Sequence, residues 1–327
     1  MTSGADERRD LWSRYWATGI PHSCGTTYEA TYGGAIGTFW REAFSTLAPV
    51  DRVLDIATGN AALPRLLLSA RPQLPAACDA VDAAAVDPDW LRQLEPQQRQ
   101  RLHVHGGVRA ESLPFADGVF SLVISQYGIE YTDWPVAIAE ALRVLAPRGR
   151  IRILAHHAES RPVMLAGHEI EHTDWLLQHD GLVDLAAGMI EPMARSASAQ
   201  GRASLATDAA ANQLRQRFND VQTALAARLT TAQCPDVLHE VRDWVAQVFR
   251  LATTGGVAAG TQALDQIRRG LVDSRLRLTD LRRHALDEVT VRQFCAAIGQ
   301  GGLHTTAVPL SDQGHLLGWA VCAEPMN

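Results

Sequence analysis

The 327-residue sequence predicts a doubly wound α/β fold: a mostly parallel sheet with a C-terminal antiparallel strand, plus a helical insertion after strand five. Three observations lead to this prediction. Short apolar strands alternate with helical segments in residues 51–158, and helical periodicity alone fills residues 159–286. Strand character returns in residues 287–327, which we expect to finish the sheet. Residues 1–50 are expected to form an N-terminal helical lid.

The predicted elements before the insertion follow the order of repeated strand–helix units. Two helices with aromatic residues on their apolar faces come first, separated by a loop rich in Gly, Pro and Thr. The expected helices are 6–18, 34–47, 63–70, one near 88–94, and 135–145; the expected strands are 52–56, 76–81, one near 102–105, 122–126 and 150–155.

The insertion and the last part of the chain have different patterns. Turn signals near Asp180, 198–202, 231–235 and 254–260 divide the insertion into at least four helices. After it, we expect a helix over 289–299 and two strands, 303–310 and 316–323, joined by a turn at 312–314. This closing hairpin is predicted to join the first sheet.

Composition excludes several classes of function. The formal net charge is -6 and no block of basic residues is dense enough to follow a phosphate backbone, so no nucleic-acid partner is expected. The chain contains no lysine, which excludes chemistry that needs one, such as a pyridoxal phosphate Schiff base or a Walker A site. We expect a cytoplasmic protein without a membrane partner, because no apolar run reaches about 18 residues and the N-terminus lacks the order of a signal peptide.

A nucleotide-binding turn is predicted where the first strand ends. Residues 53–61 read VLDIATGNA, and small residues in such a turn let a ligand approach the backbone closely. Asp55 supplies a carboxylate, and Asp82 closes the second strand where an acidic residue can hold ribose hydroxyls. Asp79 is a weaker candidate because it precedes the end of that strand. The spacing alone would suit NAD as well.

Three ordered motifs narrow the choice of ligand. VLDIATGNA at 53–61 is followed by AESLPFADGVFSLV at 110–123 and RVLAPRGR at 143–150. In this order the chain resembles the class I, Rossmann-like, S-adenosylmethionine (SAM)-dependent methyltransferases over nearly all of its sheet-forming sequence. The resemblance implies SAM as cofactor and S-adenosylhomocysteine (SAH) as product.

The family resemblance also implies roles for individual residues. The nucleotide-binding turn at the end of 53–61, the first turn of the fold, would contact the methionine and ribose parts of SAM. Asp82 would contact the ribose, and Arg109 with Ala110 would contact the adenine edge. Ser125 and Gln126 would line the reactive side. The expected cofactor residues in the first turn are Asp55, Ala57, Gly59, Asn60 and Ala61.

Aromatic residues near the N-terminus provide candidates for a lid over the cofactor. Trp16 and Tyr32 lie next to Gly-rich loops and could close over the site and exclude water. For Trp12 and Trp40 we expect packing in the core instead.

Polar and aromatic residues follow the fourth and fifth strands, on the side where the transferred methyl group should lie. His156 and His157 are the candidate general bases, with Glu130 as an orienting carboxylate or an alternative base. Tyr127 and Tyr131 are candidate walls of the substrate site. A structural role is equally open for each histidine and tyrosine.

A motif typical of metal-binding sites occurs at the start of the insertion. Residues 168–172 read HEIEH, which fits the HExxH pattern of zinc proteases, with His179 or Glu191 as a third ligand. Because the segment directly follows strand five, we interpret His168 and His172 as substrate contacts and expect no metal. A metal-assisted transfer is the intermediate alternative.

The sequence therefore predicts SAM-dependent methyl transfer to a small-molecule or natural-product acceptor by in-line displacement. The acceptor atom can be O, N, S or C. The helical insertion is expected to form a substrate lid or a homodimer surface. Two alternatives stay open: a non-catalytic SAM-fold binding protein, suggested by Ala57, Ala61 and Arg109 at positions where the family has other residues, and an HExxH metal-dependent hydrolase.

Overall fold

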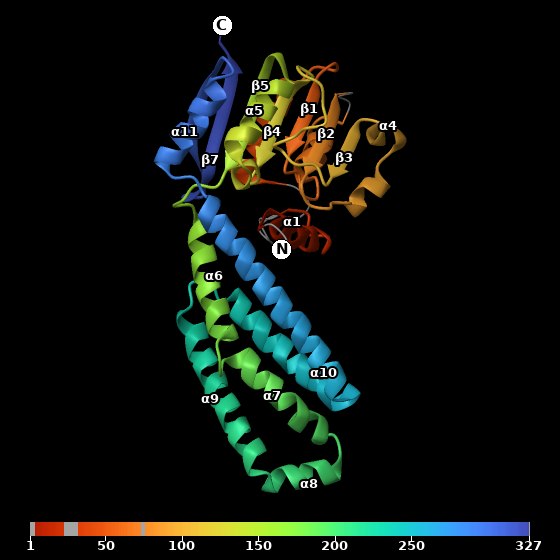
Figure 1. Ribbon diagram of the computed structural model, residues 1–327, viewed down its shortest axis with the longest axis vertical. Helices are drawn as coiled ribbons and strands as arrows, with labels where there is room; N and C mark the ends of the chain where they lie inside the picture. The colour runs from red at the N-terminus through yellow and green to blue at the C-terminus, as the bar shows by residue number, and fades with distance from the viewer. Residues whose placement is uncertain (1–3, 23–31, 73–75, 327) are drawn as a thin grey trace. The chain divides into compact units, whose positions relative to one another are not determined.

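A seven-stranded sheet forms the centre of the α/β part of the protein in the computed structural model, which describes residues 4–22, 32–72 and 76–326 (Figure 1). The strand order is β3-β2-β1-β4-β5-β7-β6, and the first five strands are parallel. The predicted fold class is confirmed, including the antiparallel hairpin at the C-terminal end. The strands are β1 Arg52–Ile56, β2 Ala77–Asp82, β3 Leu102–Gly106, β4 Phe120–Gln126, β5 Leu145–Ala155, β6 Leu303–Asp312 and β7 His315–Pro325.

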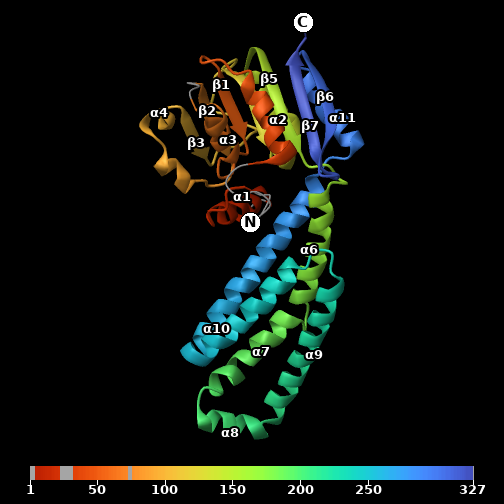
Figure 2. The same ribbon diagram turned by 180° about the vertical axis from the view of Figure 1, so that it is seen from behind.

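Helices cover both faces of the sheet, so the central strands are apolar on both sides, as parallel strands usually are. Figures 1 and 2 show α5 and α11 over one face and α2 and α3 over the other. The helices of this part are α1 Gly4–Trp16, α2 Gly34–Ser45, α3 Ala62–Ala70, α4 Pro96–Arg99, α5 Trp134–Val144 and α11 Glu288–Gly299, with short 3₁₀ helices η2 Asp89–Gln93 and η3 Ile129–Tyr131.

Two helix predictions need correction. The helix expected near 88–94 is a single 3₁₀ segment, because prolines at 88 and 96 bracket it and limit its length. The helix expected at 6–18 ends at Trp16, where a turn with Gly19 at φ 79° begins. Most of the loop expected before the second helix lies outside the described residues.

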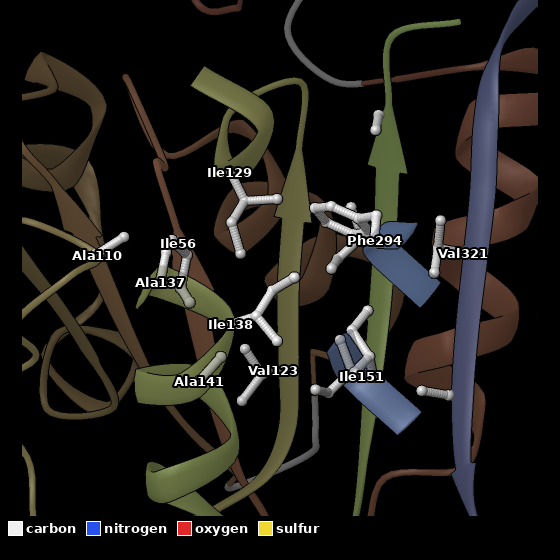
Figure 3. Packing of buried hydrophobic residues seen from close by; sticks show 14 of the residues in the cluster. Ile56, Ala110, Val123, Ile129, Ala137, Ile138, Ala141, Ile151, Phe294 and Val321 are labelled. Atoms are coloured by element: carbon white, nitrogen blue, oxygen red, sulfur yellow. The ribbon is translucent and has the colours of Figure 1, made fainter. Parts of the chain in front are cut away.

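The sheet separates two apolar clusters. One contains Ile138 of α5 and Phe294 of α11, which lie against β4 and β5 (Figure 3). The other is built on the opposite face around Trp40 and Phe44 of α2, both fully buried. Each Å² of apolar surface removed from water contributes about 25 cal/mol to folding, so the two clusters hold the strands firmly in place. The loops at the ends of the strands are thereby positioned as well.

The second compact unit, Met164–Arg282, consists of helices with an apolar core of their own. Two of the turns expected inside it are placed differently: Ser198 caps a helix that covers most of 198–202, and the turn expected over 254–260 is confined to Gly256, at φ 80°. Among the described residues, no helix is long and apolar enough to span a bilayer. The helices are α6 Arg161–Leu177, α7 Leu182–Arg195, α8 Ala199–Thr207, α9 Ala209–Thr231 and α10 Asp236–His284.

The chain leaves the sheet and returns to it at one place. The Leu286 N–H donates to the His156 carbonyl over 2.8 Å, and the Ala158 N–H donates to the Leu286 carbonyl over 2.9 Å. These bonds form a short parallel bridge directly after β5. The segment between them therefore begins and ends at neighbouring points of the α/β unit.

Replacing residues 164–282 by a short Gly/Ser linker is expected to leave the α/β unit folded, because the exit and return points are already held together by hydrogen bonds. Far-UV circular dichroism and a cooperative thermal melt would test this. The same linker placed between residues 126 and 145, where it would remove α5 from the core, is the matched control. A non-cooperative melt of the first variant would contradict the prediction.

Candidate active site

A pocket of about 230 Å³ lies at the carboxyl ends of the parallel strands. In open parallel sheets this is the edge where ligands bind. Residues that follow β1, β2, β3 and β4 line one side of the pocket, and residues of α1 line the other. Figures 1 and 2 show α1 at this end of the strands. The pocket is therefore built from loops on a rigid scaffold and closed by one helix.

The turn after β1 is strained in a way that favours a functional role. Ala57, Gly59 and Ala61 all have φ between 53° and 58°, in the left-handed region. Non-glycine residues rarely adopt this conformation, and where they do the surroundings must hold them in it. Ala57 lines the pocket, whereas Gly59 is covered by the indole ring of Trp16, which a Cβ atom at position 59 would overlap.

Asp82, at the end of β2, braces this turn. Its Oδ2 accepts the Gly59 N–H over 2.7 Å, and its Oδ1 accepts the Ala84 N–H over 2.8 Å. The residue also lines the pocket. Asp79 lies within the strand instead, where its carboxylate pairs with Arg52 and His105. The carboxylate at the pocket is therefore Asp82.

Asp55 lies behind the turn and outside the pocket lining. Its Oδ2 accepts the Thr58 hydroxyl over 2.5 Å. Burial raises the pKa of Asp55 to about 8; the Thr58 hydrogen bond opposes the rise, and the charge of Asp82 adds to it. Burial also raises the pKa of Asp82 to about 6, against the two backbone hydrogen bonds. Two buried carboxyl groups thus lie at the ends of neighbouring strands.

In the absence of cofactor, the free energy of unfolding is expected to fall as the pH rises from about 4 to about 8. The size of the fall depends on how far the pKa values of Asp55 and Asp82 are raised in the folded chain. The ordinary pKa of Asp is 3.8, so across this interval the folded chain binds more protons than the unfolded chain. Stability therefore falls as pH rises. Urea unfolding at several pH values, compared between the native chain and Asp55→Asn, measures the effect; equal pH slopes for both would contradict it.

Helix α1 supplies an aromatic and charged wall. Trp12, Trp16 and Arg8 line the pocket, and the Arg8 side chain donates to the Tyr131 carbonyl over 3.1 Å. The Asn60 side-chain amide donates to the Trp16 carbonyl over 3.0 Å, which ties the end of α1 to the first turn. The expectation that Trp12 packs in the core is wrong: its ring stacks on Trp16 and faces Tyr131 edge-on at 6.0 Å.

His156 and Glu130 form a buried pair after β5 and β4. Glu130 Oε1 accepts both the backbone N–H of His156 over 2.9 Å and its Nδ1 over 2.8 Å. Only 1% of Glu130 and 5% of His156 is exposed. The imidazole stacks on Tyr127 at 4.1 Å and meets Tyr131 edge-on at 5.8 Å. Both tyrosines line the pocket, so the pair lies directly behind its wall.

His157 is placed differently from its neighbour. Its ring stacks on Trp319 at 4.3 Å, and its Nδ1 accepts the Glu159 N–H over 3.0 Å. Burial lowers the pKa of His157. Neither the ring nor its bonded neighbours line the pocket, so the geometry favours a packing role.

Besides Asp55, Gly59, Asn60 and Ala61 of the turn after β1, three further expected cofactor residues lie outside the pocket lining, each with a clear structural role. Ser125 donates to the Ile56 carbonyl over 2.8 Å and accepts the Ile129 N–H, and so joins β1 to the loop after β4. Gln126 accepts the indole N–H of Trp40. Tyr32 is buried in the cluster on the α2 face of the sheet.

The HExxH residues belong to the helical unit. His172 is buried, and its Nδ1 accepts the Arg228 Nε–H over 3.0 Å, so one of the two possible ligand nitrogens is occupied. Burial raises the pKa of Glu169. Among the described residues, the group of potential metal ligands that lie close together is His179, Asp180 and Asp184, which does not include His168 or His172. Substrate contact by these two histidines stays a prediction.

Comparison with known proteins relates part of the chain to a family. Residues 54–153, from β1 to β5, match the family model described as a methyltransferase domain. The segment that builds the parallel strands is therefore similar to a methyltransferase domain. The resemblance derived from the sequence motifs is thereby confirmed.

Curated relatives resemble part of the chain. A demethylmenaquinone methyltransferase of Thermus thermophilus is 33% identical over 35% of this chain and 53% of its own length. A ubiquinone/menaquinone biosynthesis C-methyltransferase of Paracoccus denitrificans is 32% identical over 37% of this chain and 50% of its own length. The chain thus spans about half the length of the curated relatives it matches. A solved structure of geranyl diphosphate C-methyltransferase from Streptomyces coelicolor shares 15% identity, with a TM-score of 0.38, over 48% of this chain and 66% of its own length.

The loop after β3 brings a charged pair, Arg109 and Glu111, to the pocket lining. Arg109 lines the pocket, and its Nε donates to Glu111 over 3.4 Å. Glu111 also accepts the Asp133 N–H, and this bond together with Arg109 holds the pKa of Glu111 below its ordinary value, although burial raises it. A carboxylate therefore lies at this end of the pocket, two residues after Arg109.

Proposed function

We propose that this chain is a SAM-dependent methyltransferase that acts on a small-molecule acceptor, with His156 as the general base and Glu130 as its orienting carboxylate. The observation that carries the proposal is the Asp82-braced turn, which opens onto a pocket inside a methyltransferase domain. SAM supplies a methyl group on a sulfonium centre that an acceptor lone pair can displace.

The cofactor half of the proposal assigns residues along one side of the pocket. Ala57 and Asp82 are at the ends of β1 and β2, where the methionine and ribose parts of SAM would bind. Arg109, Ala110 and Glu111 follow β3 and would border the adenine. The pocket residues fit this ligand because a carboxylate that already accepts two backbone N–H groups retains lone pairs for ribose hydroxyls. Asp55, Gly59, Asn60 and Ala61 would act through the shape of the turn.

The acceptor half of the proposal rests on the His156 and Glu130 pair. A carboxylate oxygen only accepts hydrogen bonds, and Oε1 of Glu130 lies 2.8 Å from Nδ1 of His156, so we assign the ring proton to Nδ1. The other ring nitrogen, Nε2, is then the proton acceptor. Such a fixed tautomer suits a general base. Tyr127 stacks on the ring and Tyr131 meets it edge-on, and both would hold the base in place beside the acceptor.

The aromatic wall favours a planar, conjugated acceptor. Trp12 and Tyr131 meet edge-on in the pocket lining, and flat rings pack well against aromatic surfaces. Two relatives carry names that describe methylation in quinone biosynthesis, and one of these names specifies carbon. Carbon of an electron-rich ring is therefore our first candidate for the acceptor atom. Trp16 would act as part of a lid over the first turn.

Binding measurements would test the cofactor assignment. Titration calorimetry with SAM, SAH, NAD and zinc is expected to give saturable binding of the two adenosyl ligands and none of NAD. Absence of binding by both SAM and SAH would refute the proposal. Saturable zinc binding that is lost in His172→Ala would favour the HExxH alternative instead.

A second experiment separates an enzyme from a binding protein. Incubation with methyl-labelled SAM and a metabolite extract is expected to transfer label to a small product, whose labelled atom can be identified by NMR. A chain that binds SAH but transfers no label to any component would support the non-catalytic alternative. Size-exclusion chromatography of the native chain and of the chain without residues 164–282 would test whether the helical insertion forms a dimer.

A further inference from the structure

His284, the last residue of α10, contacts the pocket wall from outside the lining. The residue belongs to the α/β unit. Its ring lies 5.4 Å from the ring of Tyr131, at an angle of 32°, and its Nε2 is 3.2 Å from an amino nitrogen of Arg8. Arg8 and Tyr131 both line the pocket and are themselves joined by a hydrogen bond. One histidine thus touches two adjoining parts of the wall.

The contact with Arg8 fixes the protonation of the imidazole ring. A guanidinium group has only N–H donors, so Nε2 of His284 must accept. A neutral imidazole that accepts at Nε2 carries its proton on Nδ1. A doubly protonated ring would have two donors and would place a second positive charge against Arg8. The geometry therefore selects one tautomer.

We propose that His284 is a positioning residue for the cofactor pocket: by accepting from Arg8 and stacking on Tyr131, it holds α1 closed over the ends of the strands. The inference rests on the proposed function, because the ligand it helps to retain is the adenosyl cofactor. No role for this residue follows from the three methyltransferase-like motifs, which end at residue 150, or from the HExxH motif at 168–172.

The position of the contact along α1 explains why it matters. The last turn of α1 is held by two bonds, one from the Asn60 side chain to the Trp16 carbonyl and one from the Ala85 N–H to the Ser13 hydroxyl. Near its N-terminal end it is held through Arg8. That end adjoins Tyr131, which meets His156 edge-on. Loosening it would open the pocket on the side of the proposed base.

The test compares four variants for the affinity and dissociation rate of SAH, by calorimetry and stopped-flow tryptophan fluorescence. His284→Leu is expected to weaken SAH binding about tenfold, mostly through faster dissociation, as for one hydrogen bond to a charged group. His284→Gln keeps an acceptor oxygen near Nε2 and should restore binding to within about twofold of the native chain. Arg8→Gln should match His284→Leu. The double variant Arg8→Gln/His284→Leu should be no weaker than either single variant.

Controls separate positioning from a loss of fold. His315→Leu, at an exposed position of β7, should leave SAH binding unchanged, and thermal melts of all variants should agree within a few degrees. The ¹⁵N NMR spectrum of the native chain should show His284 protonated at Nδ1 and not at Nε2, a readout that needs neither ligand nor mutation.

Contrary outcomes are distinct for the two proposals. Failure of the native chain to bind SAH would overturn the proposed function and, with it, this inference. Normal SAH binding with additive effects of the Arg8 and His284 variants, or with His284→Gln as weak as His284→Leu, would overturn the inference alone. Protonation of His284 at Nε2 would overturn it as well.

Discussion

Replacing Asp82 by Asn is expected to weaken SAH binding about 100-fold at pH 8. The carboxylate braces the first turn through Gly59 and lines the pocket. Each hydrogen bond to a charged group contributes about 1.5–3 kcal/mol, and about 1.4 kcal/mol is a factor of ten in affinity. Asn keeps the shape of the side chain but has one acceptor oxygen, so it cannot brace the turn through both atoms. Calorimetry measures the loss.

Asp79→Asn is the matched control for this prediction. Asp79 lies three residues earlier on the same strand and is also buried, but its carboxylate pairs with Arg52 and His105 and does not line the pocket. We expect SAH affinity within about threefold of the native value for this variant, since it removes no contact to the ligand. Equal losses for Asp79→Asn and Asp82→Asn would contradict the assignment of the ribose site.

Replacing His156 by Ala is expected to slow methyl transfer about 100- to 1,000-fold while SAH affinity stays nearly constant. General bases typically contribute about 10²- to 10⁴-fold to a rate, and His156 does not line the cofactor pocket. The rate of label transfer from SAM in single-turnover conditions is the measurement. Glu130→Gln should lower the rate less, because the amide oxygen can still accept from Nδ1 but the charge is gone.

The neighbouring residue provides the control for the base. His157→Ala should lower the melting temperature, because the ring stacks on Trp319, but should change the rate constant of transfer little. Full label transfer in His156→Ala would remove the base assignment and leave the methyltransferase itself in place. Loss of transfer in His157→Ala with unchanged stability would move the role of base to that residue.

The sheet could be predicted from the sequence because local signals agree with the fold. Each parallel strand is a short apolar run bounded by Gly, Pro or charged residues, and each motif occurs where a strand ends. The residues of the first turn were located for the same reason, since VLDIATGNA marks both the strand and its left-handed corner. The position of Asp82 at the end of β2 followed from spacing along the chain alone.

The pocket wall could not be predicted so well, because it depends on how α1 packs. Trp12 and Trp16 are four residues apart and share one helix face, so either the core or a ligand could have covered them. The sequence does predict that His156 and His157 point to opposite sides, because neighbouring residues of an extended chain do so. Only the placement of Glu130 and Trp319 decides which side faces the pocket.

The HExxH segment shows that a sequence motif does not reveal the contacts of its side chains. Its spacing does place His168 and His172 on one face of α6, as the pattern requires. Ligand geometry also depends on what each ring nitrogen contacts, and here Arg228, from α9, takes Nδ1 of His172. A partner that lies 56 residues away in sequence cannot be read from the motif.

The order of strands has a consequence for synthesis on the ribosome. β7 is the antiparallel neighbour of β5, yet it is made only after the helical insertion, α11 and β6. Until His315–Pro325 has emerged, the nascent sheet ends in the open edge of β5, with unpaired backbone groups that can recruit another chain. Ribosomes that stall during synthesis of the helical insertion would therefore release aggregation-prone chains, and a chaperone that shields strand edges would be needed most during that interval.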